Sequence, residues 1–161
     1  MFRADVPVFS RLMFRAVHWA ARKGLRETLA PDGDVKRQAR ETGVRGETYA
    51  YWYLRRLGYV FIARNYMPRG GKGEIDLIGY DGNTLAFVEV RTRTIRKEQT
   101  ALPELSVTEE KRRTVLRTAR RFLAATRRQD TAIRFDVLAI DNRPGESPRV
   151  RLHKDALSPE A

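Results

Sequence analysis

The chain has 161 residues, 42% of them hydrophobic and 32% charged, which is about the size of one globular domain with its own core. Its 32 lysines and arginines against 20 acidic residues give a formal net charge of +12, which favours a polyanionic partner such as DNA, RNA or an anionic membrane surface. The absence of cysteine excludes disulfides, thiolate nucleophiles and cysteine-rich zinc sites, and it fits a reducing cytosol.

The composition also restricts the metals that the protein can bind. His18 and His153 are the only histidines, so a multi-histidine site is excluded. A bound metal would have mainly carboxylate ligands, which suit hard cations such as Mg²⁺ or Mn²⁺. No apolar run reaches the roughly 18 residues of a membrane span, and the N-terminus has no secretory signal. We therefore expect a cytoplasmic protein without a membrane span.

Residues 1–43 have the pattern of an extension. Between residues 8 and 29, apolar residues recur at helical spacing along one stripe and arginines along another. This predicts a basic amphipathic helix that packs on the domain or on a second copy of it, and a helix on a membrane surface is the alternative. Pro31-Asp32-Gly33-Asp34 breaks the pattern, so residues 31–43 are expected to be a polar, partly helical linker.

The compact domain is predicted to span residues 44–157, with 158–161 as a tail. Its first helix ends near Leu57, and Gly58 suits the left-handed conformation that stops a helix. Glu47 is spaced so that it shares the apolar, core-facing stripe of this helix. A buried acid needs a metal or a partner, so Glu47 is a candidate ligand; a helix cap or a pair with an arginine is the alternative.

Strand patterns and turn signals complete the domain. Strands are predicted at residues 59–66, 74–80, 84–93, 132–140 and 149–153, with turns at Asp81-Gly82 and Pro144-Gly145 and a helix beginning near Thr108. The fold class that follows is α/β, a mixed sheet flanked by helices.

Four charged residues, Glu74, Asp76, Glu89 and Arg91, interrupt the two apolar strands of the hairpin. Burying unpaired charges costs on the order of several kcal/mol, so these residues need a partner charge, a metal or solvent. Because side chains alternate along a strand, Glu74 and Asp76 share one face of the first strand, and Glu89 and Arg91 share one face of the second.

The turn decides whether the two pairs share a face. A two-residue turn at Asp81-Gly82 puts Glu74 opposite Glu89, with Asp76 diagonal to Glu89 on the same face. A four-residue loop puts Asp76 directly opposite Glu89, and a three-residue loop sends the pairs to opposite faces. Two carboxylates on one face, with a cation two residues further on, can hold a divalent ion that activates water and stabilises charge on a phosphoryl group.

Four segments in chain order resemble the YraN-like family (UPF0102) of small bacterial proteins, over about residues 44–157. The segments are Gly46-Glu47 with Ala50, Leu54 and Gly58-Tyr59; Gly73-Glu74-Ile75-Asp76-Leu77-Ile78; Phe87-Val88-Glu89-Val90-Arg91-Thr92-Arg93; and Arg134-Phe135-Asp136-Val137. This family is similar to Holliday-junction resolvases and other nucleases of the restriction-endonuclease-like fold. The resemblance implies a PD-(D/E)XK nuclease that uses Mg²⁺ or Mn²⁺.

The resemblance also implies roles for four residues, which are the catalytic candidates. Asp76 would be the motif aspartate, Glu89 the acid of the (D/E)XK element and Glu47 the helix acid of the resolvases, all three as metal ligands. Arg91 takes the place of the motif lysine. A lysine can position or deprotonate water, whereas a guanidinium stays protonated and can only orient and stabilise charge.

Basic residues accompany this constellation. The helix beginning near Thr108 has eight lysines and arginines and no acid between residues 111 and 128. We expect contacts with phosphates there and in the glycine-rich loop 68–73, rather than a merely solvated face. Such contacts position a nucleic acid without reading its sequence. The candidate nucleic-acid-binding residues are Arg69, Lys72, Arg93, Lys111, Arg113 and Arg117.

Three hypotheses follow. The first is a Mg²⁺-dependent endonuclease acting on DNA in preference to RNA, including branched DNA, as a homodimer by analogy with resolvases. The second is a non-catalytic nucleic-acid-binding protein that keeps the nuclease fold, which Arg91 favours. The third is an adaptor that binds a membrane surface through its basic N-terminal helix.

Overall fold

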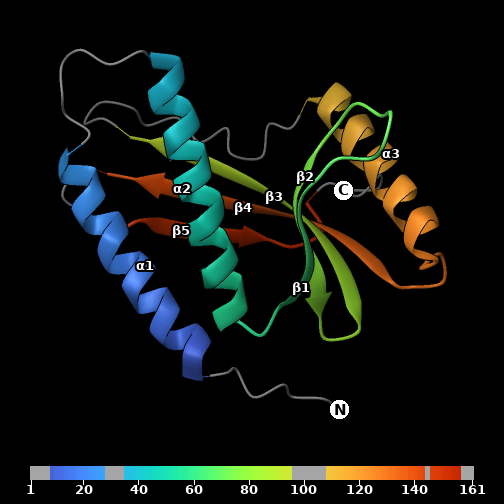
Figure 1. The fold of residues 1–161 in the computed structure, drawn as a ribbon, viewed down its shortest axis with the longest axis horizontal. Coiled ribbons are helices and arrows are strands. Elements are labelled where there is room, and N and C mark those ends of the chain that lie inside the picture. The colour runs from blue at the N-terminus through green and yellow to red at the C-terminus, as the bar shows by residue number, and fades with distance from the viewer. Residues whose placement is uncertain (1–7, 28–34, 96–107, 144–145, 157–161) are drawn as a thin grey trace.

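A computed structural model describes residues 8–27, 35–95, 108–143 and 146–156, and these form a five-stranded sheet between helices (Figure 1). The strands lie side by side in chain order, and β3 pairs in parallel with β4 while the other neighbours are antiparallel. Helix α3 makes the crossover that a parallel pair requires. The strands are β1 (Val60–Tyr66), β2 (Ile75–Asp81), β3 (Thr84–Thr94), β4 (Ile133–Asn142) and β5 (Arg149–His153).

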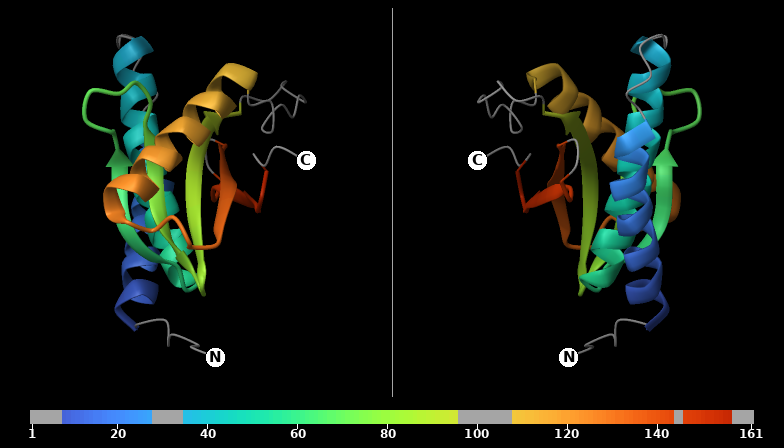
Figure 2. Two further views of the ribbon diagram at one scale, coloured as in Figure 1. Left: turned by 90° about the vertical axis from the view of Figure 1, so that its right-hand side faces the viewer. Right: turned by 90° about the vertical axis from the view of Figure 1, so that its left-hand side faces the viewer.

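The helices cover the two faces of the sheet (Figure 2). α1 (Val8–Glu27) and α2 (Val35–Arg56) lie on one side, and α3 (Glu109–Thr126) lies on the other. Two apolar clusters form the core: Phe87 and Phe135 pack against Phe122 of α3, and Val88 and Leu138 pack in the cluster that contains Leu54 of α2. The prediction of a mixed α/β sheet flanked by helices, with an N-terminal helix, is confirmed.

The N-terminal helix docks on the domain, as one of the alternatives predicted. Phe14 of α1 is only 8% exposed, and its ring packs edge-on against the rings of Tyr49 and Tyr53 of α2. His18 Nδ1 lies 2.8 Å from the hydroxyl of Tyr49. Within the described residues, no helix has the length and apolar character needed to cross a membrane.

Helix α2 is longer than predicted at its start and ends where predicted. It begins at Val35, so most of the predicted linker, residues 31–43, is helical. The linker was expected to be only partly helical. Gly58, with φ of +101°, follows its last turn, and the backbone N–H of Tyr59 bonds the carbonyl of Leu54 at 3.1 Å. The predicted turn at Pro144-Gly145 and the tail at 158–161 lie outside the described residues.

The β2–β3 turn lies one residue later than predicted. Tyr80 pairs with Leu85 and Asp81 with Thr84, so Gly82 and Asn83 form the tip, and Gly82 has a φ of +62°. The register continues to the pair Leu77 and Val88. Extended by one position, this register would put Asp76 opposite Glu89, which is the arrangement expected of the longer loop. Glu89 lies close enough to Asp76 for its charge to raise the pKa of Asp76.

Candidate active site

Glu89 lies on the face of the sheet that α3 covers. Leu85 and Phe87 of β3 point into the cluster with α3, and alternation places Glu89 and then Arg91 on the same side. Glu89 is only 6% exposed, so its charge has lost most of its hydration. A carboxylate in this position is stable only if nearby groups compensate its charge.

One cation from α3 and one from β3 approach a single oxygen of Glu89. Lys111 Nζ lies 2.9 Å from Oε1, and Arg91 Nε lies 3.7 Å from the same atom, beyond hydrogen-bonding distance. The other oxygen, Oε2, is buried and has no hydrogen-bond partner among the described residues. A buried carboxylate oxygen without a partner is costly, and it is a ready ligand for a hard cation.

Asp76 is the second acid of the pair. Its Oδ2 accepts a 2.6 Å hydrogen bond from the backbone N–H of Val90, which leaves Oδ1 outside that bond. Burial raises the pKa of Asp76 to about 7, reinforced by the charge of Glu89 and less by that of Glu47; the bond from Val90 and the charge of Lys111 oppose the rise. An acid whose pKa is raised by burial and by a neighbouring acid has too little positive charge around it.

Glu47 lies near this pair without joining it. Its charge contributes to the raised pKa of Asp76, yet its Oε2 accepts a 2.8 Å hydrogen bond from the side-chain amide of Asn65. Over the part of the chain that the structure describes, no three histidine or acidic side chains gather closely enough to hold a metal ion. The candidate ligands that the structure brings together are therefore two acids, Asp76 and Glu89.

Helix α2 is held close to the sheet next to Glu47. Gly46 is buried, and a Cβ atom there would lie 1.9 Å from Oγ1 of Thr92. Only a glycine permits this approach. Gly46 thus allows α2 to pack closely on β3. Because Glu47 is the next residue, this packing also brings its carboxylate near Asp76.

Arg93 is engaged in an ion-pair cluster of its own. Its Nε donates to Asp141 at 2.5 Å, and Arg151 donates to the same carboxylate at 2.6 Å. Burial opposes ionisation of Asp141, but the hydrogen bonds from Arg93 and Arg151 outweigh it and hold the pKa of Asp141 below its usual value. A phosphate contact at Arg93 would have to share the guanidinium with Asp141.

The other predicted phosphate contacts lie along α3 and the loop before β2. Arg69 and Lys72 are exposed in that loop, as are Arg113 and Arg117 on α3. The loop leans on α3, because a Cβ at Gly71 would lie 1.9 Å from the guanidinium of Arg121 and one at Gly73 would lie 2.6 Å from Thr114 and Thr118. Arg113 also pairs with Glu109 at 3.0 Å. The exposed cations of the loop and of α3 therefore lie on two segments that contact each other.

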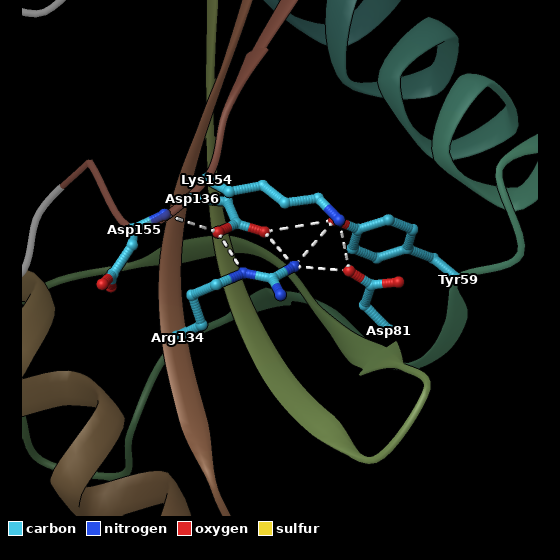
Figure 3. Close-up of polar contacts among 6 residues, drawn as sticks. All are labelled: Tyr59, Asp81, Arg134, Asp136, Lys154 and Asp155. Carbon is cyan, nitrogen blue, oxygen red and sulfur yellow. Dashed lines mark hydrogen bonds and ion pairs between the residues drawn. The ribbon is translucent and has the colours of Figure 1, made fainter. Parts of the chain in front are cut away.

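A second buried acid, Asp136, is fully satisfied by its neighbours (Figure 3). Arg134 donates to both of its oxygens, at 2.7 and 2.9 Å, and Tyr59 and the backbone N–H of Asp155 donate one bond each. Arg134 also reaches Asp81 at 2.7 Å. Arg134 and Asp136, two residues of one motif segment, thus form a buried ion pair. Asp136 has no oxygen left for a metal, in contrast to Glu89.

Comparison with known proteins identifies the family. A sequence model of the uncharacterised protein family UPF0102 matches residues 46–140. A UPF0102 protein of Koribacter versatilis is 38% identical over 134 residues, which are 83% of this chain and 90% of the relative. One of Geobacter sulfurreducens is 41% identical over 120 residues, 74% of this chain and 91% of the relative.

The chain belongs to the UPF0102 family. A further UPF0102 protein, from Geotalea daltonii, is 39% identical over 125 residues, 78% of this chain and 95% of the relative. The UPF0102 match begins at Gly46, after α1 and the first half of α2. It includes the acids, both cations at Glu89 and the ion pair that supports β4: Glu47, Asp76, Glu89, Arg91, Lys111, Arg134 and Asp136.

Sequence reasoning missed two contacts of the site. The sequence predicts a phosphate contact for Lys111, which in the structure pairs with Glu89, and it does not predict Asn65 as the partner of Glu47. For Lys111 a signal existed, because it precedes the buried Val115 by one helical turn and so shares its stripe. For Asn65 the sequence contains no such signal. Its unusual backbone conformation, with a φ of +49°, is visible only in the structure.

Proposed function

We propose that this UPF0102 protein is a metal-dependent endonuclease of the PD-(D/E)XK type that hydrolyses phosphodiester bonds in DNA. The observation that carries the proposal is the unpartnered, buried Oε2 of Glu89, close to Asp76 and to the cations of Lys111 and Arg91. The mixed sheet with helices on both faces agrees with the restriction-endonuclease-like fold that the family resembles. Asp136 supports this interpretation by contrast. A buried acid that binds no ligand should have hydrogen bonds to both oxygens, and Asp136 has them.

The donor set fits Mg²⁺ or Mn²⁺. Asp76 and Glu89 would hold the ion, and Mg²⁺ in particular is commonly bound by one or two carboxylates together with substrate phosphates and water. Glu47 would support this pair from outside, since its charge already acts on Asp76. When bound, the metal would supply Lewis-acid stabilisation of charge on the phosphoryl group and activation of water.

The chain's own residues would hold and orient the reactants. In the hydrolysis, a water oxygen bonds to phosphorus and one phosphorus–oxygen ester bond breaks. One water proton remains on the new phosphate oxygen and the other ends on the leaving oxygen. Arg91, with 43% of its side chain exposed, would stabilise the negative charge of the five-coordinate phosphate. It stays protonated throughout.

The substrate would be bound through its backbone. Arg69 and Lys72 in the loop before β2, with Arg113 and Arg117 on α3, are exposed, and the chain as a whole has a net charge of +12. Contacts of this kind predict affinity that falls steeply with salt and depends little on base sequence. A preference for four-way junctions, and a homodimer to bind them, follow only by analogy with resolvases.

The alternative function is DNA binding without cleavage. The observation that favours it is Arg91, because a guanidinium stands where the related nucleases have a lysine, and it lies 3.7 Å from Glu89. This alternative keeps the basic surface and the fold and assigns the acid pair no chemistry.

Cleavage assays separate the two functions. Purified protein is incubated with linear, nicked and four-way-junction DNA, with EDTA, Mg²⁺ or Mn²⁺. We expect metal-dependent cleavage that Asp76→Ala and Glu89→Gln each reduce by about a hundredfold or more, since each removes a ligand. Glu146→Gln, which removes an exposed acid far from the pair in the sequence, is the control and should cleave normally. Salt-sensitive binding without cleavage under any metal would establish the alternative instead.

A further inference from the structure

The cation closest to Glu89 comes from helix α3 and not from the strand that carries the acid. Lys111 Nζ lies 2.9 Å from Oε1, whereas Arg91 Nε lies 3.7 Å away. The first distance is that of a charge-assisted hydrogen bond and the second is not. Thus the only amine that the structure places on this carboxylate, within the residues it describes, is that of Lys111.

The packing of α3 fixes Lys111 in this position. Thr108 caps the helix by accepting a bond from the backbone N–H of Lys111, so the first turn of α3 is ordered around this residue. Val115, one turn later on the same stripe, is 2% exposed in the core. The side chain of Lys111 therefore points towards the sheet, and only 34% of it is exposed.

We propose that Lys111 supplies, from α3, the amine that the strand lacks at Arg91, and that it acts directly on the reacting phosphate. This inference rests on the proposed nuclease function. An ammonium group has three donors, and Glu89 Oε1 occupies one of them. The two that remain can donate to the attacking water and to a non-bridging phosphoryl oxygen. A guanidinium is planar and fixed in a fork, so Arg91 cannot replace this small group.

The proposal differs from a purely structural role for Lys111. If the lysine only positioned Glu89, its loss would disturb the carboxylate and weaken metal binding along with cleavage. If it acts on the reacting phosphate, its loss should impair cleavage while the two acids still bind the metal. The removal of a neighbouring positive charge should even favour the cation.

Four variants test the proposal: Lys111→Met, Lys111→Arg, Arg91→Lys and the double variant Lys111→Met/Arg91→Lys. Arg112→Met is the matched control, because Arg112 is the neighbouring half-buried cation of the same turn and pairs with Glu109 at 3.7 Å. Single-turnover cleavage in Mn²⁺, Mn²⁺ affinity by calorimetry and DNA affinity in Ca²⁺ are measured for each, with thermal unfolding as the check on folding.

We expect Lys111→Met to slow cleavage by about 10²–10⁴-fold, with Mn²⁺ affinity equal to or higher than that of the wild type. Lys111→Arg keeps a positive charge next to Glu89, so this variant should remain folded. Its cleavage should still be slow, because arginine has no amine. The double variant returns a lysine to the strand and should recover at least about tenfold of the lost rate. Arg112→Met should match the wild type in Mn²⁺ affinity.

Several results would overturn the inference. Cleavage by Lys111→Met or Lys111→Arg at close to the wild-type rate would show that the amine is not needed. Loss of Mn²⁺ binding in folded Lys111→Met would show that the lysine only positions Glu89. In either case an active wild type leaves the nuclease function intact. A wild type that cleaves no DNA under any metal refutes the nuclease function, and the role of Lys111 with it.

Discussion

Asp76 is a residue whose ionisation opposes folding. Its pKa rises from 3.8 to about 7 on folding, chiefly because the carboxyl is buried and secondly because Glu89 faces it. Below pH 4 the group is protonated in both states and costs nothing. Between the two pKa values the folded state keeps a proton that the unfolded state has lost, so the free energy of unfolding falls as the pH rises. Above about pH 7 the carboxyl is ionised in both states, and the destabilisation is constant. Functional sites commonly contain such unfavourable charges.

The residue-scale prediction is that Asp76→Asn stabilises the protein in a pH-dependent way. At pH 8 we expect a higher Tm and a gain on the order of a few kcal/mol, because the amide carries no charge to bury and can still accept the bond from Val90. At pH 4 the gain should be nearly absent. Thermal unfolding from pH 4 to 8 measures it, with the exposed Asp130→Asn as control. A gain that is constant with pH would refute the burial argument.

At the scale of elements, the approach of α2 to β3 determines where Glu47 lies. Two glycines of α2 have opposite surroundings: a Cβ at Gly46 would collide with Thr92, whereas one at Gly43 would meet nothing within 4 Å. Substitution by alanine should therefore have opposite effects on stability at Gly46 and at Gly43. The helix is pressed against the strand at one position and free of it at the other.

We expect Gly46→Ala to destabilise the protein by about 1–3 kcal/mol, because the added methyl forces α2 away from β3. Gly43→Ala should stabilise it by about 0.5–1 kcal/mol, since alanine suits a helix interior better than glycine. Urea unfolding of both variants provides the comparison. Thr92→Ser keeps the hydroxyl that the methyl would meet, so it should not rescue Gly46→Ala, whereas Thr92→Gly should recover part of the loss. Equal effects of the two alanines would contradict the close approach.

At the scale of the whole molecule, one charged network connects segments that are distant in the chain. Asp136 of β4 binds Tyr59 before β1 and Asp155 after β5, and Arg134 links it to Asp81 at the β2–β3 turn (Figure 3). Lys154 adds a second cation at Asp81, 2.7 Å away. Burial opposes ionisation of Asp81, but the hydrogen bonds from Lys154 and Arg134 prevail and lower its pKa. The network therefore connects the segments next to both edge strands, β1 and β5, with β4 and with the β2–β3 turn.

We expect Asp136→Asn to destabilise the protein by about 3–5 kcal/mol, because it removes one partner of a buried pair and leaves the charge of Arg134 less compensated. The double variant Asp136→Asn/Arg134→Met should lose less than the sum of the single changes, and urea unfolding in a double-mutant cycle measures the difference. The exposed pair Glu146 and Arg149 is the control, and its loss should cost under about 1 kcal/mol. An additive cycle would show that the pair does not act as a unit.

The sequence by itself determined the elements and the chemistry of the site. Apolar periodicity and turn residues are local properties, so the helices and strands, including the stop at Gly58, followed from them. The lack of cysteine, the two histidines and the acids of the hairpin mean that any metal bound here would be a hard cation held by carboxylates. The family was also recognisable, because its motifs are short and contiguous.

Only the tertiary structure decided which of these groups meet. The β2–β3 register, which brings Asp76 close to Glu89, depends on the exact tip of a turn, and a shift of one residue reverses every face. Lys111 reaches Glu89 because α3 packs across the sheet with Val115 inward, and Glu47 is held by Asn65 because α2 presses on β3 at Gly46. Such contacts join residues far apart in the chain, and they follow from packing that no local pattern encodes.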